Sequence, residues 1–107
     1  MGIYNEFSVI IGVCSGEVIQ ETKTVLTVFG NKVEYPEDYL EEKGLEAVTS
    51  YNGEYLYVGH MIKRLTEEDS GTLTRDELDE VFSLAQSKFE SEGYTGPLRL
   101  IYCWEQH

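Results

Sequence analysis

Alternating apolar and polar residues open the chain. Tyr4, Glu6 and Ser8 alternate with apolar residues at odd positions: Ile3, Phe7, Val9, Ile11 and Val13. A period of two predicts a half-buried strand. A turn at residues 14–17 and a run of β-branched residues at 18–29 predict a second strand that returns antiparallel until Gly30 and Asn31 end it.

The middle of the chain predicts a short helix. Pro36 suits the first turn of a helix, and residues 36–43 (PEDYLEEK) are helix formers that Gly44 closes. Four of these eight residues are Glu or Asp besides one Lys, so the helix is strongly acidic.

A β-hairpin is predicted next. Residues 45–51 and 54–65 are each typical of a strand, and the Asn-Gly pair between them favours a type I′ turn. A two-residue loop would set Tyr51 opposite Glu54, Thr49 opposite Leu56 and Ala47 opposite Val58. Residues 96–104 predict a final strand with four large side chains on one face: Leu98, Leu100, Tyr102 and Trp104.

The stretch TEEDSGTLTRDELDEVF (66–82) permits two interpretations, of which the first is a capped helix. Thr74 is a good N-cap, and Glu77 three residues later completes a capping box, while Leu73 and Leu78 form a hydrophobic staple. The helix then carries an apolar stripe made of Leu78, Val81, Phe82, Ala85 and Phe89. Gly93 ends the helix.

In the second interpretation, residues 66–77 resemble the calcium-binding loop of the EF-hand family. Gly71 matches the glycine of the sharp turn, and Glu77 matches the closing carboxylate. The first ligand should be Asp, and here it is Thr66; the segment before the loop is also typical of a strand, not of the incoming helix. We therefore favour the capped helix and keep a degenerate EF-hand-like calcium module as an alternative.

Together these elements predict one α+β domain over residues 1–107, in the order β-β-α-β-β-α-β. We expect an antiparallel sheet of about five strands with one long and one short helix packed on one face. When the first strand is left out, the remaining order β-α-β-β-α-β is that of the ferredoxin-like fold. A ferredoxin-like fold with an extra N-terminal strand is therefore one arrangement that fits.

The net charge of the chain limits the classes of molecule that it could bind. The chain has 20 Asp and Glu against eight Lys and Arg, which gives a formal net charge of -12. Such a field repels nucleic acid and anionic membranes and favours a basic protein partner. The N-terminus has no secretory signal pattern, no run spans a bilayer, and the two cysteines form no CxxC motif, so we expect a cytoplasmic protein.

The long helix supplies the candidate binding residues. At 100° per residue, one side opposite the apolar stripe carries carboxylates and hydroxyls: Asp76, Asp79, Glu80, Ser83, Ser87 and Glu90. Tyr55 and Tyr57 share one face of their strand and would form an exposed aromatic patch if that face lay away from the helices. These eight residues are the predicted partner-binding set.

The resulting hypothesis is a small acidic protein that inhibits or neutralises a basic, nucleic-acid-binding or nuclease-like protein by stoichiometric binding. The alternatives are an assembly subunit that forms a homo-oligomer, the calcium module, and an enzyme with Cys14 as nucleophile and His60 as base. No cluster of catalytic motifs is present, so we expect no catalytic residue, no metal and no cofactor.

Overall fold

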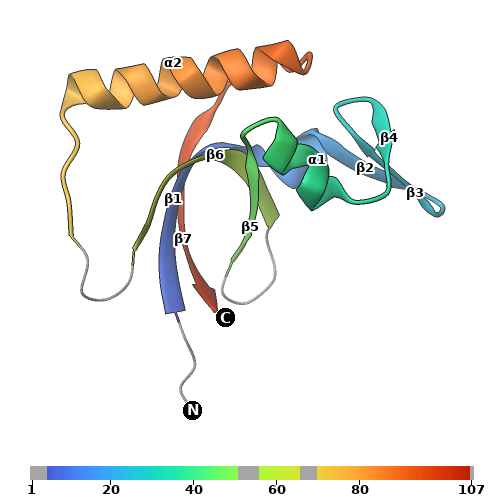
Figure 1. Cartoon of the computed structure of the whole chain (residues 1–107), viewed down its shortest axis with the longest axis horizontal. Helices are drawn as coiled ribbons and strands as arrows, with labels where there is room; N and C mark the ends of the chain where they lie inside the picture. The colour runs from blue at the N-terminus through green and yellow to red at the C-terminus, as the bar shows by residue number, and fades with distance from the viewer. Residues whose placement is uncertain (1–4, 51–55, 66–69, 107) are drawn as a thin grey trace.

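The computed structural model describes residues 5–50, 56–65 and 70–106, which form two antiparallel sheets and two α-helices (Figure 1). The elements in chain order are β1 (Asn5–Cys14), a 3-10 helix η1 (Ser15–Glu17), β2 (Ile19–Thr22), β3 (Val25–Val28), β4 (Asn31–Val33), α1 (Pro36–Glu42), β5 (Glu46–Thr49), β6 (Leu56–Leu65), α2 (Arg75–Ser91) and β7 (Arg99–Gln106). The α+β class is therefore confirmed.

The larger sheet has the strand order β5-β6-β1-β7, with every neighbouring pair antiparallel. The N-terminal strand β1 lies in the interior of this sheet, so the expectation that it is an extra strand is wrong. Gly12 of β1 faces Gly59 of β6, and a Cβ on Gly12 would lie 1.9 Å from the backbone oxygen of Val58. Only glycine permits this approach of the two backbones.

The smaller sheet contains β2, β3 and β4 and is inserted between β1 and α1. The single strand predicted over residues 18–29 is divided in two, because Lys23 adopts a φ of 58° and reverses the chain. A second tight turn has Phe29 and Gly30 at φ of 50° and 81°, and β4 follows it. The expectation of one sheet with about five strands is therefore corrected to a sheet of four and a sheet of three.

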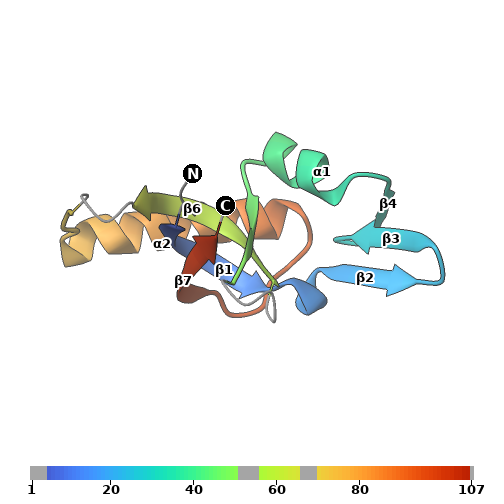
Figure 2. The same cartoon turned by 90° about the horizontal axis from the view of Figure 1, so that it is seen from below.

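The strands of the larger sheet bend strongly below α2 (Figure 1), and the view from below shows them twisted relative to one another (Figure 2). Its two edge strands, β5 and β7, come into contact although two strands lie between them in the sheet. Ser8, Ile10 and Val48 are almost fully buried on the concave face, while α2 packs against the opposite, convex face of β1 and β6. Curvature therefore buries the concave face without a covering helix.

The main hydrophobic core joins both sheets and both helices. Phe89 of α2 is its largest member and packs edge-to-face against Phe29 and Tyr94, with ring centroids 5.7 and 5.5 Å away. Burying one such side chain contributes roughly 1.5–3 kcal/mol. The fully or almost fully buried residues of this cluster are Val13, Val18, Val28, Leu40, Leu45, Val58 and Phe89.

Candidate functional site

The outer face of α2 carries the six helix residues that the sequence predicted. All six side chains are exposed, and the helix buries Ala85 and Phe89 on its opposite side. Gln86 donates a hydrogen bond to Glu90 (3.1 Å), whereas Asp76, Asp79 and Glu80 have no ion pair or hydrogen bond with any residue in the described part of the chain. This acidic face is defined as Asp76, Asp79, Glu80, Ser83, Ser87 and Glu90.

A capping box fixes where α2 begins, as predicted. The Glu77 amide donates to Thr74 Oγ1 (3.2 Å), and the Thr74 amide donates to Glu77 Oε1 (3.4 Å). The Thr74 hydroxyl also donates to Glu77 Oε1 (3.0 Å). The carboxylate that would close an EF-hand loop is thus engaged in the helix cap. Residues 66–69 of that loop lie outside the described residues.

Lys88 fixes one flank of α2 to the sheet. Its Nζ donates to the carbonyl oxygen of Gly44 (2.9 Å) and lies 2.8 Å from Nδ1 of His60, which accepts a hydrogen bond in the neutral ring. Burial lowers the pKa of His60 below its usual 6.5, and the charge of Lys88 lowers it further. The acidic face therefore points away from β6.

The two predicted tyrosines do not join the acidic face. Tyr57 faces Val48 across the β5–β6 pair, on the concave side of the sheet, where it is half-buried. Because neighbouring residues of a strand point to opposite faces, Val58 points to α2 and Tyr57 points away. The face lies away from the helices, as an exposed patch would require, but the curvature of the sheet covers it. Tyr55 lies outside the described residues.

The proposed pair of Cys14 and His60 is not assembled. Cys14 is in register with Tyr57, whereas His60 is in register with Ile11, so the two side chains lie on opposite faces of the sheet. His60 is bound to Lys88 instead. Cys14 and Cys103, the only two cysteines of the chain, form no disulfide.

Sequence reasoning missed a groove of about 510 Å³ between the smaller sheet, the start of α1 and the β5–β6 edge. Ile19, Leu26, Ala47 and Leu56 supply apolar walls that come from four different strands. Four consecutive residues at the N-terminus of α1 also line the groove: Tyr35, Pro36, Glu37 and Asp38. The last lining residue is Glu21 of β2. No local pattern predicts this groove, because it depends on the separation of the two sheets.

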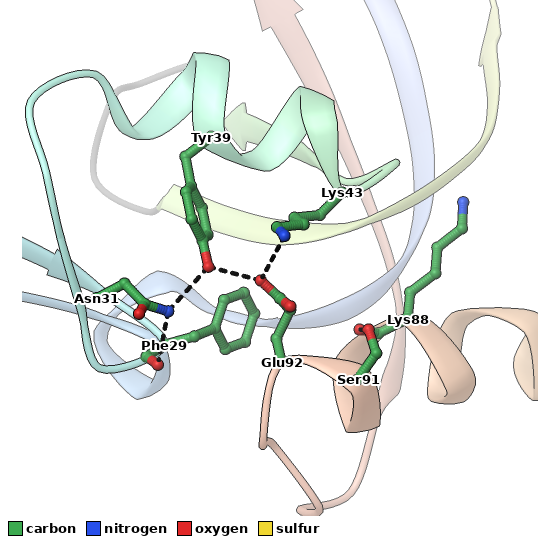
Figure 3. A network of polar contacts seen from close by, with 7 residues as sticks. All are labelled: Phe29, Asn31, Tyr39, Lys43, Lys88, Ser91 and Glu92. Carbon is green, nitrogen blue, oxygen red and sulfur yellow. Dashed lines mark hydrogen bonds and ion pairs between the residues drawn. The ribbon is translucent and has the colours of Figure 1, made fainter.

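A hydrogen-bonded network holds α1 in place (Figure 3). Tyr39 of α1 donates to Glu92 at the end of α2 (2.6 Å), and Asn31 of β4 donates to the Tyr39 hydroxyl (3.0 Å). Lys43 lies 3.8 Å from the Glu92 carboxylate and 5.5 Å from the centre of the Tyr39 ring. The hydrogen bond to Glu92, followed by burial, raises the pKa of Tyr39 above 10.0. The network ties three segments that are distant in sequence.

The last strand carries an exposed apolar stripe. Leu100, Tyr102 and Trp104 of β7 are 44%, 68% and 46% exposed, although their alternation resembles that of a buried strand face. The Phe7 ring on β1 lies beside them at a tilt, with its centroid 5.2 Å from that of Trp104 and 6.1 Å from that of Tyr102. The stripe is exposed because α2 packs mainly against β1 and β6 and leaves the outer face of β7 uncovered.

No helix in the described part of the chain has the length and apolar character needed to cross a bilayer. Comparison with protein-family models, with curated proteins and with solved structures finds no match.

Proposed function

We propose that this protein is a small acidic cytoplasmic binding protein that inhibits or neutralises a basic protein by stoichiometric binding. The single observation that supports the proposal most is the acidic face of α2, where Asp76, Asp79 and Glu80 are exposed and without described partners. A nucleic-acid-binding or nuclease-like protein has the complementary charge. Free nucleic acid and anionic membranes are repelled by a net charge of -12.

The mechanism follows from the energetics of exposed charges. A single exposed ion pair contributes only about 0.2–1 kcal/mol, so the acidic face acts through many weak attractions. Their main effect is on encounter, because complementary fields raise association rates and make them sensitive to salt. Occupation of the partner's basic surface would then block its access to nucleic acid.

A charge-reversal experiment tests the acidic face. Asp79→Lys with Glu80→Lys changes the net charge by four, and Glu41→Lys with Glu42→Lys on α1 is the matched control with the same change. Wild type and the two variants are immobilised and exposed to the same cell lysate at about 50 and about 300 mM salt. The Debye length falls from about 14 to about 6 Å between these two conditions.

The expected result is a basic protein that wild type and the α1 control retain at low salt and that the α2 variant loses. When that basic protein is purified, the α2 variant should associate with it at least about tenfold more slowly than wild type does. Equal retention by all three proteins would refute a role for the acidic face.

The exposed stripe on β7 favours a second candidate, an assembly subunit that forms a homo-oligomer. Leu100, Tyr102 and Trp104 on a second copy could cover one another. Light scattering on wild type and on Tyr102→Ser with Trp104→Ser tests this; a wild-type monomer at about 100 μM, well above the dissociation constant expected of a specific interface, would contradict it.

For the fold, we propose that the ferredoxin-like order applies with a different boundary from the one expected. Without the smaller sheet, the elements follow the order β1-α1-β5-β6-α2-β7, which is β-α-β-β-α-β. In this proposal the smaller sheet is an insertion after the first strand.

A further inference from the structure

The groove beside α1 combines apolar walls with an acidic rim. Leu26 and Leu56 lie on opposite sides of it, from β3 and β6, and Leu56 is 38% exposed. Its volume of about 510 Å³ lies within the range of known ligand sites, which is about 300–1,000 Å³. The groove is therefore large enough for one or two side chains of a partner.

The rim is acidic on two different elements. Glu37 and Asp38 belong to the first turn of α1, where carboxylates also favour the helix dipole. That explanation does not extend to Glu21, which comes from β2 on the other wall. All three side chains are exposed, and no described residue forms an ion pair or hydrogen bond with them.

The two walls are held in position relative to each other. Asn31 of the smaller sheet donates to the Tyr39 hydroxyl of α1, and Tyr39 in turn donates to Glu92 of α2 (Figure 3). Pro36 fixes the backbone at the start of α1, directly at the groove. A ligand would therefore meet walls that are already arranged, which lowers the entropy cost of binding.

From this geometry we propose that the groove is the anchor site for a cationic, amphipathic segment of a protein partner. An apolar side chain of the partner occupies the space between Leu26 and Leu56, and a neighbouring Arg or Lys reaches Glu21, Glu37 or Asp38. The proposal rests on the proposed function, since it names the part of a basic partner that this chain recognises. It locates the desolvated contact in the groove, whereas the acidic face of α2 steers encounter.

The test uses n-hexylguanidinium as the probe, because it joins an aliphatic chain to the charged group of Arg. The probe is titrated into ¹⁵N-labelled full-length protein, and backbone amide shifts are followed by NMR. Saturable shifts are expected at Leu26, Ala47 and Leu56. Uncharged n-hexanol should produce the same pattern only at concentrations up to about fivefold higher, since it lacks the charge that pairs with the rim.

Charge-matched variants separate the rim from the overall field. Glu21→Gln, Glu37→Gln and Asp38→Asn together remove three charges at the groove. Glu41→Gln, Glu42→Gln and Glu90→Gln remove three charges elsewhere on exposed helix positions. The rim variant should bind the probe up to about fivefold more weakly than the control, because the single guanidinium loses an exposed ion pair of at most about 1 kcal/mol. Circular dichroism spectra verify that both variants are folded.

Three outcomes would overturn the proposal: equal affinity for n-hexylguanidinium and n-hexanol, equal affinity of the two charge-removed variants, or shifts confined to residues outside the groove. The two sites have separate variants and separate measurements: the rim variant is judged by the amide shifts that the probe causes in the groove, and Asp79→Lys with Glu80→Lys by retention of the basic protein. Failure of the groove and failure of the proposed function are therefore distinguishable.

Discussion

Gly12→Ala should be far more damaging than an ordinary glycine substitution. The added Cβ would lie 1.9 Å from the Val58 oxygen and 2.6 Å from Cα of Gly59. Reaching the 3.4 Å of ordinary contact requires β1 and β6 to separate by about 1.5 Å at this point. Backbone hydrogen bonds of the pair would exceed the usual limit of about 3.2 Å.

The magnitude follows from the contacts that this separation affects. About two interstrand hydrogen bonds at roughly 1 kcal/mol each are weakened. The adjacent pair Val13–Val58 belongs to the main core, and imposed overpacking there costs about 1–3 kcal/mol. The expected loss is thus about 3–5 kcal/mol, a large share of the about 5–15 kcal/mol typical of a folded domain.

Urea unfolding followed by circular dichroism measures this effect. Gly16→Ala is the matched control, because nothing lies within 4 Å of the position its Cβ would take. Its free energy of unfolding should stay within about 0.5 kcal/mol of wild type. If Gly12→Ala were as stable as Gly16→Ala, the close approach of the two strands, and with it the reason for these glycines, would be refuted.

Two further predictions concern partly buried polar contacts. The lowered pKa of His60 means that the unfolded chain takes up a proton near pH 6.5 before the folded one does, so stability should fall as pH drops below about 6.5. Denaturant titrations from pH 7 to 5 should show the free energy of unfolding falling with pH in wild type and not in His60→Gln, whose amide oxygen can still accept a hydrogen bond from Lys88. An equal fall in both proteins would contradict the assignment of this pH dependence to His60. Tyr39→Phe removes the hydrogen bond to Glu92 and should cost about 1.5–3 kcal/mol in urea unfolding, whereas Tyr35→Phe, 64% exposed, should cost almost nothing. Similar losses in the two tyrosine variants would show that the network does not stabilise the fold.

Local signals predicted several elements well. The β5–β6 register is the one that the Asn-Gly pair predicted, with Thr49 opposite Leu56 and Ala47 opposite Val58. The predicted pair Tyr51–Glu54 lies outside the described residues. Gly44 and Gly93 end their helices at φ of 73° and 89°, and the cap of α2 begins where the sequence placed it. Each of these features depends on residues close together in the chain, which explains why it could be predicted.

Features that depend on distant residues could not be predicted. Nothing in the run 18–29 indicated a reversal at Lys23, because a non-glycine residue with positive φ has no clear sequence signal. The stripe of Leu100, Tyr102 and Trp104 has the pattern of a buried face, and only the position of α2 leaves it exposed. The acidic face of α2 was predictable from helix periodicity, whereas the covering of Tyr57 required the curvature of the sheet.

The smaller sheet also has a dynamic consequence. Its strands span only four, four and three residues, and Val28 is the single fully buried side chain among them. A unit with so little buried area should open locally before the whole domain unfolds, so its amides should exchange with solvent faster than those of β1. An occupant of the neighbouring groove would contact Ile19, Glu21 and Leu26 of this sheet. Because the occupant binds only the closed arrangement, it would slow this exchange, and the exchange rates of β2 and β3 would report whether the groove is occupied.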